Sequence, residues 1–307
     1  MSSKHASTIT LSVIIPVYNQ ADYLEQCLDA LAHQTLPSDQ FEVIVIDNGS
    51  DVPPREIVES HNFARYGVEP RPGSFAARNH AIPMAKGKIL AFTDSDCLPH
   101  ADWLEAAITA LQSPASIDVV AGRIDVVSKD PNHPSSIELF DIAIRLDQES
   151  RVAASNGVVT ANMVTRREMF DRVGQFDDSL MSGADAEWSQ RAAEKGYNVK
   201  FVDEAVVVHP ARTSLTEVLT QVRRRAGGRF DMHSGRTRKL TLFETARSAA
   251  KKLMPRIAGL CGARRRLQQR GYGWWSWLRI IPIVQLVHYS ALIEIVRRKC
   301  GFEAERR

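Results

Sequence analysis

Three short runs of β-branched and other apolar residues each end abruptly in polar residues. They are LSVIIPVYN (residues 11–19), FEVIVIDNGS (41–50) and ILAFTDSD (89–96). Runs this short, and apolar at nearly every position, are typical of strands that are buried on both faces. Between them, residues 20–34 place apolar side chains on one face of a helix, and residues 102–111 predict another helix. This alternation predicts an α/β fold with a mostly parallel sheet flanked by helices.

Later segments extend the same pattern. Residues 118–127 and 158–170 are expected to form strands with turns, and residues 199–210 a pair of strands. In open α/β sheets, ligands bind beyond the carboxyl ends of the strands. The polar tips PVYN, DNGSD and TDSD all lie at such ends, so we expect a site there.

Charge divides the chain unevenly. Residues 1–211 carry 17 Lys and Arg against 30 Asp and Glu, a net charge of −13, whereas residues 212–307 carry 22 against 6, a net charge of +16. An acidic body with a basic end suggests two roles, the second toward a polyanionic partner. We expect one domain at 1–235 and a basic, partly apolar helical extension at 236–307.

The cysteines and the N-terminus indicate a reducing compartment. The four cysteines are widely spaced and include no C-x-x-C pair, which argues against a zinc knuckle and a disulfide framework. The first ten residues, MSSKHASTIT, contain no apolar stretch, so no signal peptide is visible. We therefore expect a cytoplasmic protein.

Asp94 and Asp96 follow the third strand one residue apart. Two like charges this close repel unless a positive group lies between them. Carboxylates are ligands for hard divalent cations, so the pair could hold a metal. The alternative is an Asp-rich, solvated turn.

Two further segments carry candidate ligand-binding residues. Asp47 ends an apolar strand, where its carboxylate could accept a hydrogen bond from a base, although the Asn-Gly that follows is also a strong turn signal. Arg78 stands near the start of a predicted helix, in GSFAARNHAI, where it could contact a phosphate. It could equally be a surface arginine.

The segment MSGADAEWSQRAAEKGY predicts a helix that begins near Asp185 and ends at Gly196. Asp185 could be a general base at a loop-to-helix junction, or the residue of a capping box that begins at Ser182. His209 ends the apolar run AVVVH. It is a structural histidine unless the aspartate pair already holds a metal.

The order and spacing of these motifs resemble those of the family 2 glycosyltransferases. The matching segments are the opening strand with PVYN, then IDNGS, AARN, AFTDSD, GADAEW and VVVHP, across residues 10–211. The resemblance implies a GT-A, Rossmann-like fold and an inverting enzyme that uses a nucleotide-sugar donor. It also implies a divalent metal cofactor, Mn²⁺ or Mg²⁺. UDP-sugars are the family's commonest donors. The acceptor would be a saccharide or a lipid-linked molecule of cell-envelope polysaccharide or glycolipid synthesis, and no nucleic acid is expected as a partner.

The same resemblance assigns a role to each candidate residue. Asp96 is similar to the direct metal ligand, and His209 to a position that joins the metal in some members. Asp185 resembles the catalytic base, with Glu187 as a rival because Ala184 stands where many members have Glu. The nucleotide-binding positions are Pro16, Val17, Tyr18, Asp47, Arg78, Asp94 and Ser95.

Some features depart from particular members or from other classes. In QVRRR, Arg225 stands where processive synthases have Trp, which argues against processivity. An aspartate-nucleophile phosphatase would carry Thr or Val where Leu98 stands, and a dinucleotide-dependent dehydrogenase would have G-x-G-x-x-G after its first strand. A non-catalytic nucleotide-sugar-binding module remains an alternative if Asp185 only caps its helix.

The C-terminal segment has features of a membrane-surface anchor. Residues 280–293 carry no formal charge, but this stretch is shorter than the roughly 20 apolar residues of a spanning helix. Three tryptophans precede it, at 274, 275 and 277, and the basic clusters 264–266 and 297–299 flank it. We expect peripheral association with an anionic membrane surface on the cytoplasmic face, with an ordinary core helix and a spanning helix as the alternatives.

Overall fold

The structure is a computed structural model. It describes residues 9–155, 157–180, 182–234, 260–300 and 302. The expected boundary at residue 235 and the basic segment that follows it, up to residue 259, lie outside these residues, so the predicted domain division stays a prediction.

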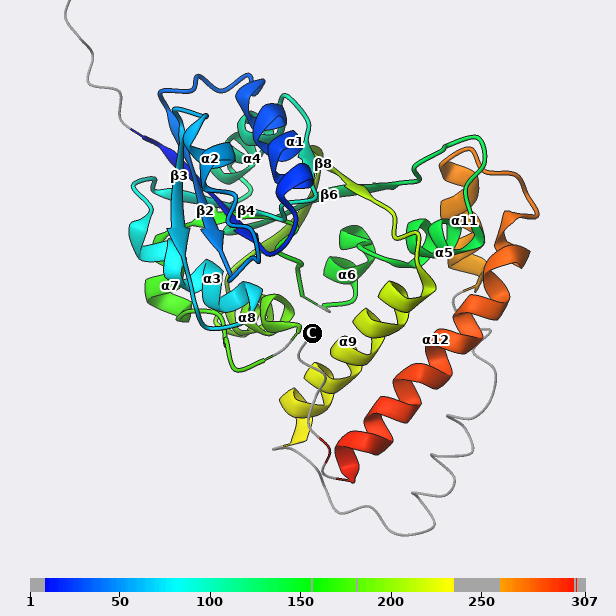
Figure 1. Cartoon of the computed structure of the whole chain (residues 1–307). Helices are drawn as coiled ribbons and strands as arrows, with labels where there is room; N and C mark the ends of the chain where they lie inside the picture. Colours follow the sequence, from blue (N-terminus) through cyan, green and yellow to red (C-terminus); the bar gives the residue numbers. More distant parts are fainter. Residues whose placement is uncertain (1–8, 156, 181, 235–259, 301, 303–307) are drawn as a thin grey trace, which may run out of the picture. The chain divides into compact units, whose positions relative to one another are not determined.

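The described strands form one eight-stranded sheet in the order β3-β2-β1-β4-β7-β6-β8-β5 (Figure 1). The strands are β1 (Leu11–Val17), β2 (Phe41–Asp47), β3 (Ala64–Val68), β4 (Ile89–Thr93), β5 (Leu98–Pro99), β6 (Val119–Val127), β7 (Asn162–Arg166) and β8 (Val199–Pro210). The α/β fold class is confirmed, and the sheet is mixed. β1 is parallel to β2 and β4, and β2 to β3. β7 is antiparallel to β4 and β6, and β5 to β8.

Eleven α-helices and one 3₁₀ helix are described. They are α1 (Ala21–Ala32), α2 (Arg55–Glu59), α3 (Ser74–Ala81), η1 (Ile82–Met84), α4 (Trp103–Gln112), α5 (Ser136–Ile144), α6 (Gln148–Ala153), α7 (Glu168–Val173), α8 (Ala184–Glu194), α9 (Leu215–Ser234), α11 (Leu260–Gln269) and α12 (Ser276–Lys299). The expected helices at 20–34, 102–111 and after Asp185 are therefore confirmed. The expected strand pair at 199–210 is wrong, because this segment is the single strand β8. Its charged residues Lys200, Asp203 and Glu204 stay extended and exposed, and Asp203 pairs with Arg123 of the neighbouring β6, with 3.0 Å between the charged atoms.

The chain divides into two compact units. The sheet unit comprises Met1–Asp125, Leu146–Asp178 and Ala184–His209. The helical unit comprises Val126–Arg145, Ser179–Gly183 and Pro210–Arg307.

The core of the sheet unit is built on β1 and β2, in which every residue is buried. Helix α3 packs against these two strands. The apolar face predicted for α1 is buried at Leu24, Cys27, Leu28 and Leu31. An aromatic cluster of Phe92, Phe170, Phe176 and Trp188 joins β4 to α7 and α8. Trp188 stacks on Phe170 with their ring centroids 4.8 Å apart, so the start of α8 is held beside the end of β4.

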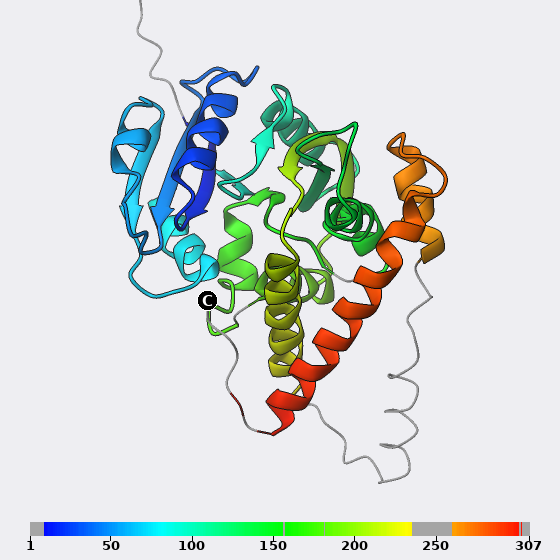
Figure 2. The same cartoon turned by 45° about the vertical axis from the view of Figure 1, so that its right-hand side comes forward.

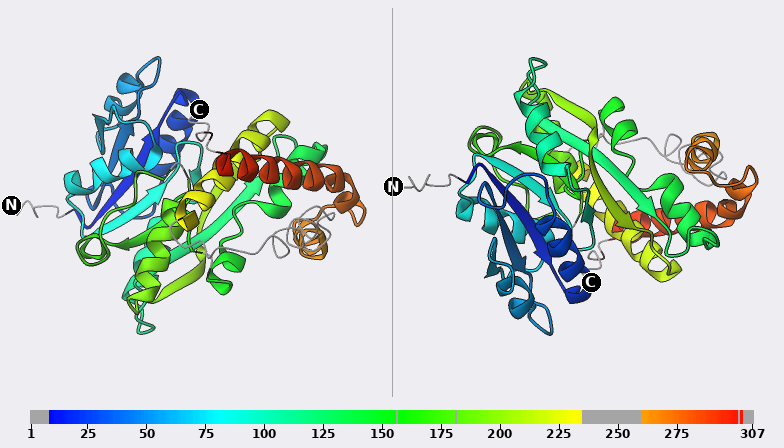
Figure 3. Two further views of the ribbon diagram at one scale, coloured as in Figure 1. Left: turned by 90° about the horizontal axis from the view of Figure 1, so that it is seen from below. Right: turned by 90° about the horizontal axis from the view of Figure 1, so that it is seen from above.

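In the helical unit, α12 packs against α9, α5 and α11. The pairing of α9 (yellow) with α12 (red) is visible in both Figure 2 and Figure 3. Helix α5 begins with a capping box of Ser135 and Glu138, which satisfies backbone N–H groups at the helix start. Among the described helices, α12 contains a segment, Ser276–Arg298, that is long and apolar enough to cross a membrane by length and composition alone. In the most apolar stretch of this segment, 22% of the residues are buried.

Candidate active site

The strand register brings the polar tips of β1, β2 and β4 to one edge of the sheet. Val17 pairs with Asp47 across β1 and β2. Phe92 of β4 pairs with Ile14 of the parallel β1, so Asp94, two residues later, is level with Pro16. The three tips that the sequence singled out therefore lie side by side, as expected for the ligand-binding edge of such a sheet.

Asp47 is fixed at the end of β2, with 2% of its surface exposed. Its carboxylate accepts hydrogen bonds from the Ser50 backbone N–H (2.9 Å) and from the Tyr66 hydroxyl (2.9 Å). Burial, followed by the hydrogen bond and charge of Asp47, raises the pKa of Tyr66 to about 12. Tyr18, in contrast, is 38% exposed just beyond β1. A buried carboxylate beside an exposed aromatic ring could bind the edge and the face of a flat heterocycle.

Asn48 ties the tip of β2 to the loop that leads into α3. Its side-chain amide donates to the carbonyls of Glu69 and Arg71, and its oxygen accepts from the Gly73 N–H. Gly73 has a φ of +129°, a conformation that L side chains rarely adopt, so a glycine is required at this bend. The bend starts α3 and thereby directs Arg78 toward the same edge.

Arg78 forms an ion pair with Asp94. The arginine is 3% exposed, whereas the side chain of Asp94 is 36% exposed. The positive group beside Asp94 is thus a guanidinium that the protein itself supplies. Ser95, between the two aspartates, is buried and donates its hydroxyl to the Gln20 side chain (2.6 Å).

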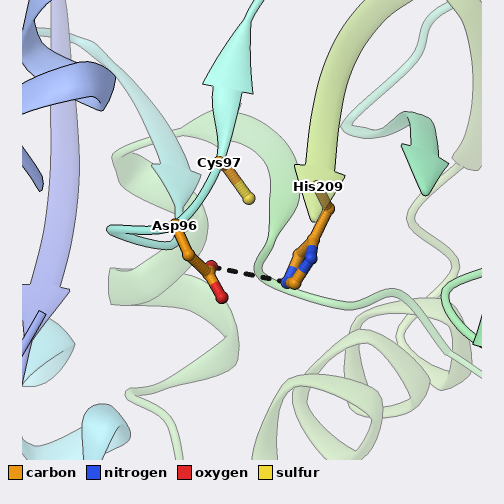
Figure 4. A group of neighbouring side chains, drawn as sticks. All are labelled: Asp96, Cys97 and His209. Atoms are coloured by element: carbon orange, nitrogen blue, oxygen red, sulfur yellow. Dashed lines mark ion pairs between the residues drawn. The ribbon is translucent and has the colours of Figure 1, made fainter. Parts of the chain in front are cut away.

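Asp96 faces His209, with the carboxylate oxygen 3.4 Å from Nε2 (Figure 4). The antiparallel pairing of Leu98 with Val208 brings Cys97 opposite His209, so the register of β5 and β8 builds this cluster. One ligand atom each from Asp96, Cys97 and His209 lies within 4.8 Å of the others. His209 and Cys97 are buried.

The two buried cysteines are kept in the thiol form near this cluster. Burial, followed by the charges of Asp96 and Asp94, raises the pKa of both Cys27 and Cys97. Cys97 donates to the Ala161 carbonyl, with 3.8 Å between sulfur and oxygen. All four cysteines carry free thiols.

Asp185 lies at the start of α8 and is buried. Its carboxylate accepts the backbone N–H groups of Thr160 (3.1 Å) and Ala186 (2.8 Å). Ala161, the residue after Thr160, accepts a hydrogen bond from the Thr93 hydroxyl through its backbone carbonyl (3.1 Å). Two successive residues thus contact Asp185 on one side and the end of β4 on the other, which brings Asp185 into the neighbourhood of the aspartate pair.

Glu187, in contrast to Asp185, is bound by an arginine side chain. It pairs with Arg191 through both carboxylate oxygens, with N–O distances of 2.6 and 3.0 Å. Arg191 also donates to the carbonyls of Val173 and Gln175. Glu187 therefore anchors a loop to α8 through Arg191, whereas Asp185 accepts backbone N–H groups and, among the described residues, has no arginine bound across both of its oxygens.

Several residues that hold the site in place were not found from the sequence. Gln148 accepts from the Val159 N–H and donates to the Asn162 carbonyl, and Ser189 accepts from the Val158 N–H. Asn162 offered one signal, since it is an amide at the start of β7, within a segment that the sequence predicts to be a strand. Gln148, Ser189 and Asn48 lie next to other polar residues in the sequence, and only the tertiary structure reveals what they bind.

Comparison with known proteins identifies the family. Residues 12–174 match the model described as Glycosyl transferase family 2. The chain belongs to this family. Its expected membership is therefore confirmed, and it is an enzyme of the glycosyltransferase class.

Two curated family 2 relatives show how far the similarity extends. The glycosyltransferase AglE of Haloferax volcanii is 36% identical over 207 residues, which are 66% of this chain and 67% of AglE. The pre-mycofactocin glycosyltransferase of Mycobacterium tuberculosis is 29% identical over 218 residues, which are 67% of this chain and 44% of that protein. The chain thus spans less than half the length of the second relative.

Solved structures confirm the GT-A glycosyltransferase fold. The mannosyltransferase PcManGT from Pyrobaculum calidifontis, in complex with GDP-Man and Mn²⁺, matches 94% of this chain and 87% of its own at 22% identity, with a TM-score of 0.61. S. aureus TarS 1-349, in complex with UDP-GlcNAc, matches 96% of this chain and 93% of its own at 18% identity, with a TM-score of 0.55.

Proposed function

We propose that this family 2 enzyme transfers a sugar from a nucleotide-sugar to an acceptor hydroxyl with inversion at the anomeric carbon, and that Asp185 is the general base. The observation that carries the proposal is the link through Thr160 and Ala161. It joins Asp185 to the end of β4, where Asp94 and Asp96 begin. A single displacement needs a base on the acceptor side of the anomeric carbon, opposite the leaving group, and a carboxylate near the aspartate pair can serve as that base.

On the donor side, each residue proposed to bind the nucleotide has a role that suits its surroundings. The exposed ring of Tyr18 would pack on the base beyond Pro16 and Val17 at the end of β1, and Asp47 at the end of the neighbouring β2 would accept a base N–H. Arg78 would contact the diphosphate or hold Asp94 against the ribose. Ser95 would act through its backbone, because its hydroxyl is already donated to Gln20. Structural neighbours bind GDP-Man and UDP-GlcNAc, so both bases belong in a first screen, with UDP-sugars tested first.

The donor set at Asp96 and His209 fits a divalent cation such as Mn²⁺ or Mg²⁺. A carboxylate and an imidazole already face each other at 3.4 Å, and Mn²⁺ takes both ligand types. Cys97 is less suited as a third ligand, because it donates its proton to the Ala161 carbonyl. When bound, the cation would neutralise charge on the departing nucleoside diphosphate. PcManGT, which shares the fold, was solved with Mn²⁺.

Asp185 would remove the proton of the acceptor hydroxyl as its oxygen attacks the anomeric carbon. A positioned general base contributes about 10²–10⁴-fold in rate. The two backbone N–H groups that contact Asp185 keep its carboxylate in one orientation, which favours a base of defined geometry. Glu187 is a weaker candidate, since Arg191 already binds both of its oxygens.

We further propose a cytoplasmic enzyme at the periphery of the membrane, acting on a saccharide or lipid-linked acceptor of the cell envelope. The basic balance of residues 212–307 and the exposed Trp274 and Trp275 support this location. Exposed tryptophans are favoured at the depth of lipid headgroups.

The test is a screen of nucleotide-sugars by nucleotide release, with Mn²⁺ or Mg²⁺, with and without a membrane lipid extract. We expect release from at least one donor, loss of release in excess chelator, and loss of turnover in Asp96→Ala. The matched control is Asp171→Ala, which removes an exposed carboxylate from α7 and should keep full turnover. Nucleotide binding without turnover of any donor would indicate a binding module, and full activity in chelator would exclude the metal role.

A further inference from the structure

One face of α12 is an exposed apolar stripe. Its members recur every three or four residues, which is the spacing of a single helical face. They are Leu278, Pro282, Leu286, Tyr289, Ile293 and Val296. Ile293 is 59% exposed and Val296 58%. At 1.5 Å per residue the stripe is about 27 Å long, and the exposed Trp275 continues it beyond the first turn.

The remaining surface of α12 holds polar groups inside the helical unit. Glu294 is 1% exposed and pairs with Arg297, with 3.2 Å between the charged atoms. The buried Ser290 accepts from Arg223 of α9 (3.3 Å). The helix is therefore amphipathic, with its buried carboxylate paired within α12 and its buried hydroxyl bound to the neighbouring basic helix α9.

This second face decides how the helix can meet a bilayer. A helix that crossed the membrane would carry Glu294 and Arg297 through hydrocarbon, or draw the arginines of α9 in with them. Placing charged groups in hydrocarbon costs free energy, and pairing them with an opposite charge removes only part of that cost. A helix that lies in the membrane plane needs to bury only the stripe, and its polar contacts with α9 remain in place.

We propose that the stripe of α12 docks flat on an anionic membrane surface. The charge of this part of the chain favours an anionic membrane as the partner of the stripe. Residues 212–307 carry a net charge of +16, which complements anionic lipid headgroups. A second copy would bring the same positive charge to the contact and be repelled. Arg265 is exposed on α11, and the Arg264 guanidinium lies 3.4 Å from the centre of the Trp274 ring, which joins a cation to an aromatic ring near the start of α12.

Not every basic residue of the two clusters is available to lipid. Arg266 donates to the Ala143 carbonyl, Arg298 to the Phe302 carbonyl, and Arg297 pairs with Glu294. We therefore assign the apolar stripe the larger share of the binding and Arg265 an electrostatic share. The inference rests on the peripheral location in the proposed function and supplies the surface for it.

The experiment is co-flotation of the full-length protein with vesicles of phosphatidylcholine alone or with 30% phosphatidylglycerol. We expect the wild type to float with the anionic vesicles, to be released by alkaline carbonate, and to bind less in high salt. Ile293→Asn with Val296→Asn should lower binding at least tenfold, because each exposed aliphatic side chain that enters the interface adds to affinity. The matched control is Val127→Asn, an exposed valine on β6, which should bind as the wild type does. Arg265→Gln should weaken binding mainly at low salt.

Each alternative has its own outcome. Absence of binding to anionic vesicles at low salt would overturn the proposal, as would a stripe variant that binds as well as the wild type. Resistance to carbonate would indicate a spanning helix. A wild-type dimer that the stripe substitutions convert to a monomer, without vesicle binding, would indicate a second copy on the stripe. Nucleotide release from a soluble mixture should be unchanged in the stripe variants, so failure of docking and failure of the catalytic proposal give different results.

Discussion

The two carboxylates in the first turn of α8 can be separated by a pair of isosteric substitutions, Asp185→Asn and Glu187→Gln. Each removes a negative charge and keeps the size of the side chain. Both residues lie on the same turn, so general effects on the helix are shared. Their surroundings differ, and the two variants should therefore lose different properties.

Asp185→Asn should lose rate. An asparagine oxygen can still accept one of the two N–H groups, from Thr160 or Ala186, but its amide nitrogen must face the other. That loss costs about 1–3 kcal/mol of stability, the usual range for a buried group left without its partner. The rate should fall by about 10²–10⁴-fold, the contribution of a general base.

Glu187→Gln should lose a little stability but keep its rate. The pair with Arg191 joins side chains that are 24% and 30% exposed, and such partly solvated pairs contribute about 1 kcal/mol or less. Arg191 would keep its hydrogen bonds to the Val173 and Gln175 carbonyls. We expect turnover within about threefold of the wild type and a melting temperature lower by about 2–4 °C.

The assay measures turnover at saturating donor and acceptor, nucleotide binding, and thermal unfolding on the same preparations. Asp185→Asn is expected to bind nucleotide and remain folded at the assay temperature. If it turns over normally while folded Glu187→Gln is inactive, Glu187 is the base. If the activity of Asp185→Asn returns at low temperature in step with its folded fraction, Asp185 acts as a helix cap and the reasoning fails.

Three further predictions concern stability and reactivity. Gly87→Ala should destabilise the protein by about 1–3 kcal/mol in urea unfolding, because a Cβ would lie 2.6 Å from the backbone of β1, whereas Gly262→Ala in α11, whose nearest atom lies at 3.6 Å, should be neutral or stabilising by up to about 1 kcal/mol. The hydrogen bond from Arg71 lowers the pKa of Glu69 from 4.5 to about 2, so its contribution to stability is present above pH 4.5 and lost as the pH falls toward 2; Glu69→Gln should remove this part of the acid sensitivity, and an unchanged stability-pH profile would contradict it. A water-soluble thiol reagent should modify the two exposed cysteines of the native enzyme rapidly and spare the two buried ones until unfolding, and four equally fast thiols would contradict the structure. The exposed cysteines are Cys261 and Cys300, and the buried ones are Cys27 and Cys97.

The strands β1, β2 and β4 could be predicted from the sequence because their residue composition is compatible with few structures other than a buried strand. Each of β1, β2 and β4 is a short run that is buried at every position, and each leads directly into polar residues. Parallel pairing then brings the polar ends together, and the observed register of Val17 with Asp47 is its consequence. Asp47 and the aspartates after β4 could be proposed before any coordinates were known.

Strand direction and side-chain partners could not be obtained in this way. A strand buried on both faces has the same composition whether its neighbours are parallel or antiparallel, so the antiparallel β7 gave no signal of its direction. The partner of Arg78 was also open, because a helical arginine next to alanines can face solvent or core. The exposure of the stripe on α12 likewise depends on which face of the helix α9 covers. The sequence of an apolar segment does not indicate that face.

The partners of Asp94 and Asp96 explain how two neighbouring carboxylates divide their roles. Arg78 is buried beside Asp94 and forms an ion pair with it, so this carboxylate is neutralised by the protein and is a poor competitor for a cation. Asp96 faces an imidazole, which can give up its proton and bind a metal as a neutral ligand, as a guanidinium cannot. The aspartate beside the arginine is therefore suited to orient the nucleotide, and the aspartate beside the histidine to hold the metal. In the proposed function, the guanidinium next to Asp94 and a metal cation bound beside Asp96 would balance both carboxylates of this three-residue turn at the end of a buried strand.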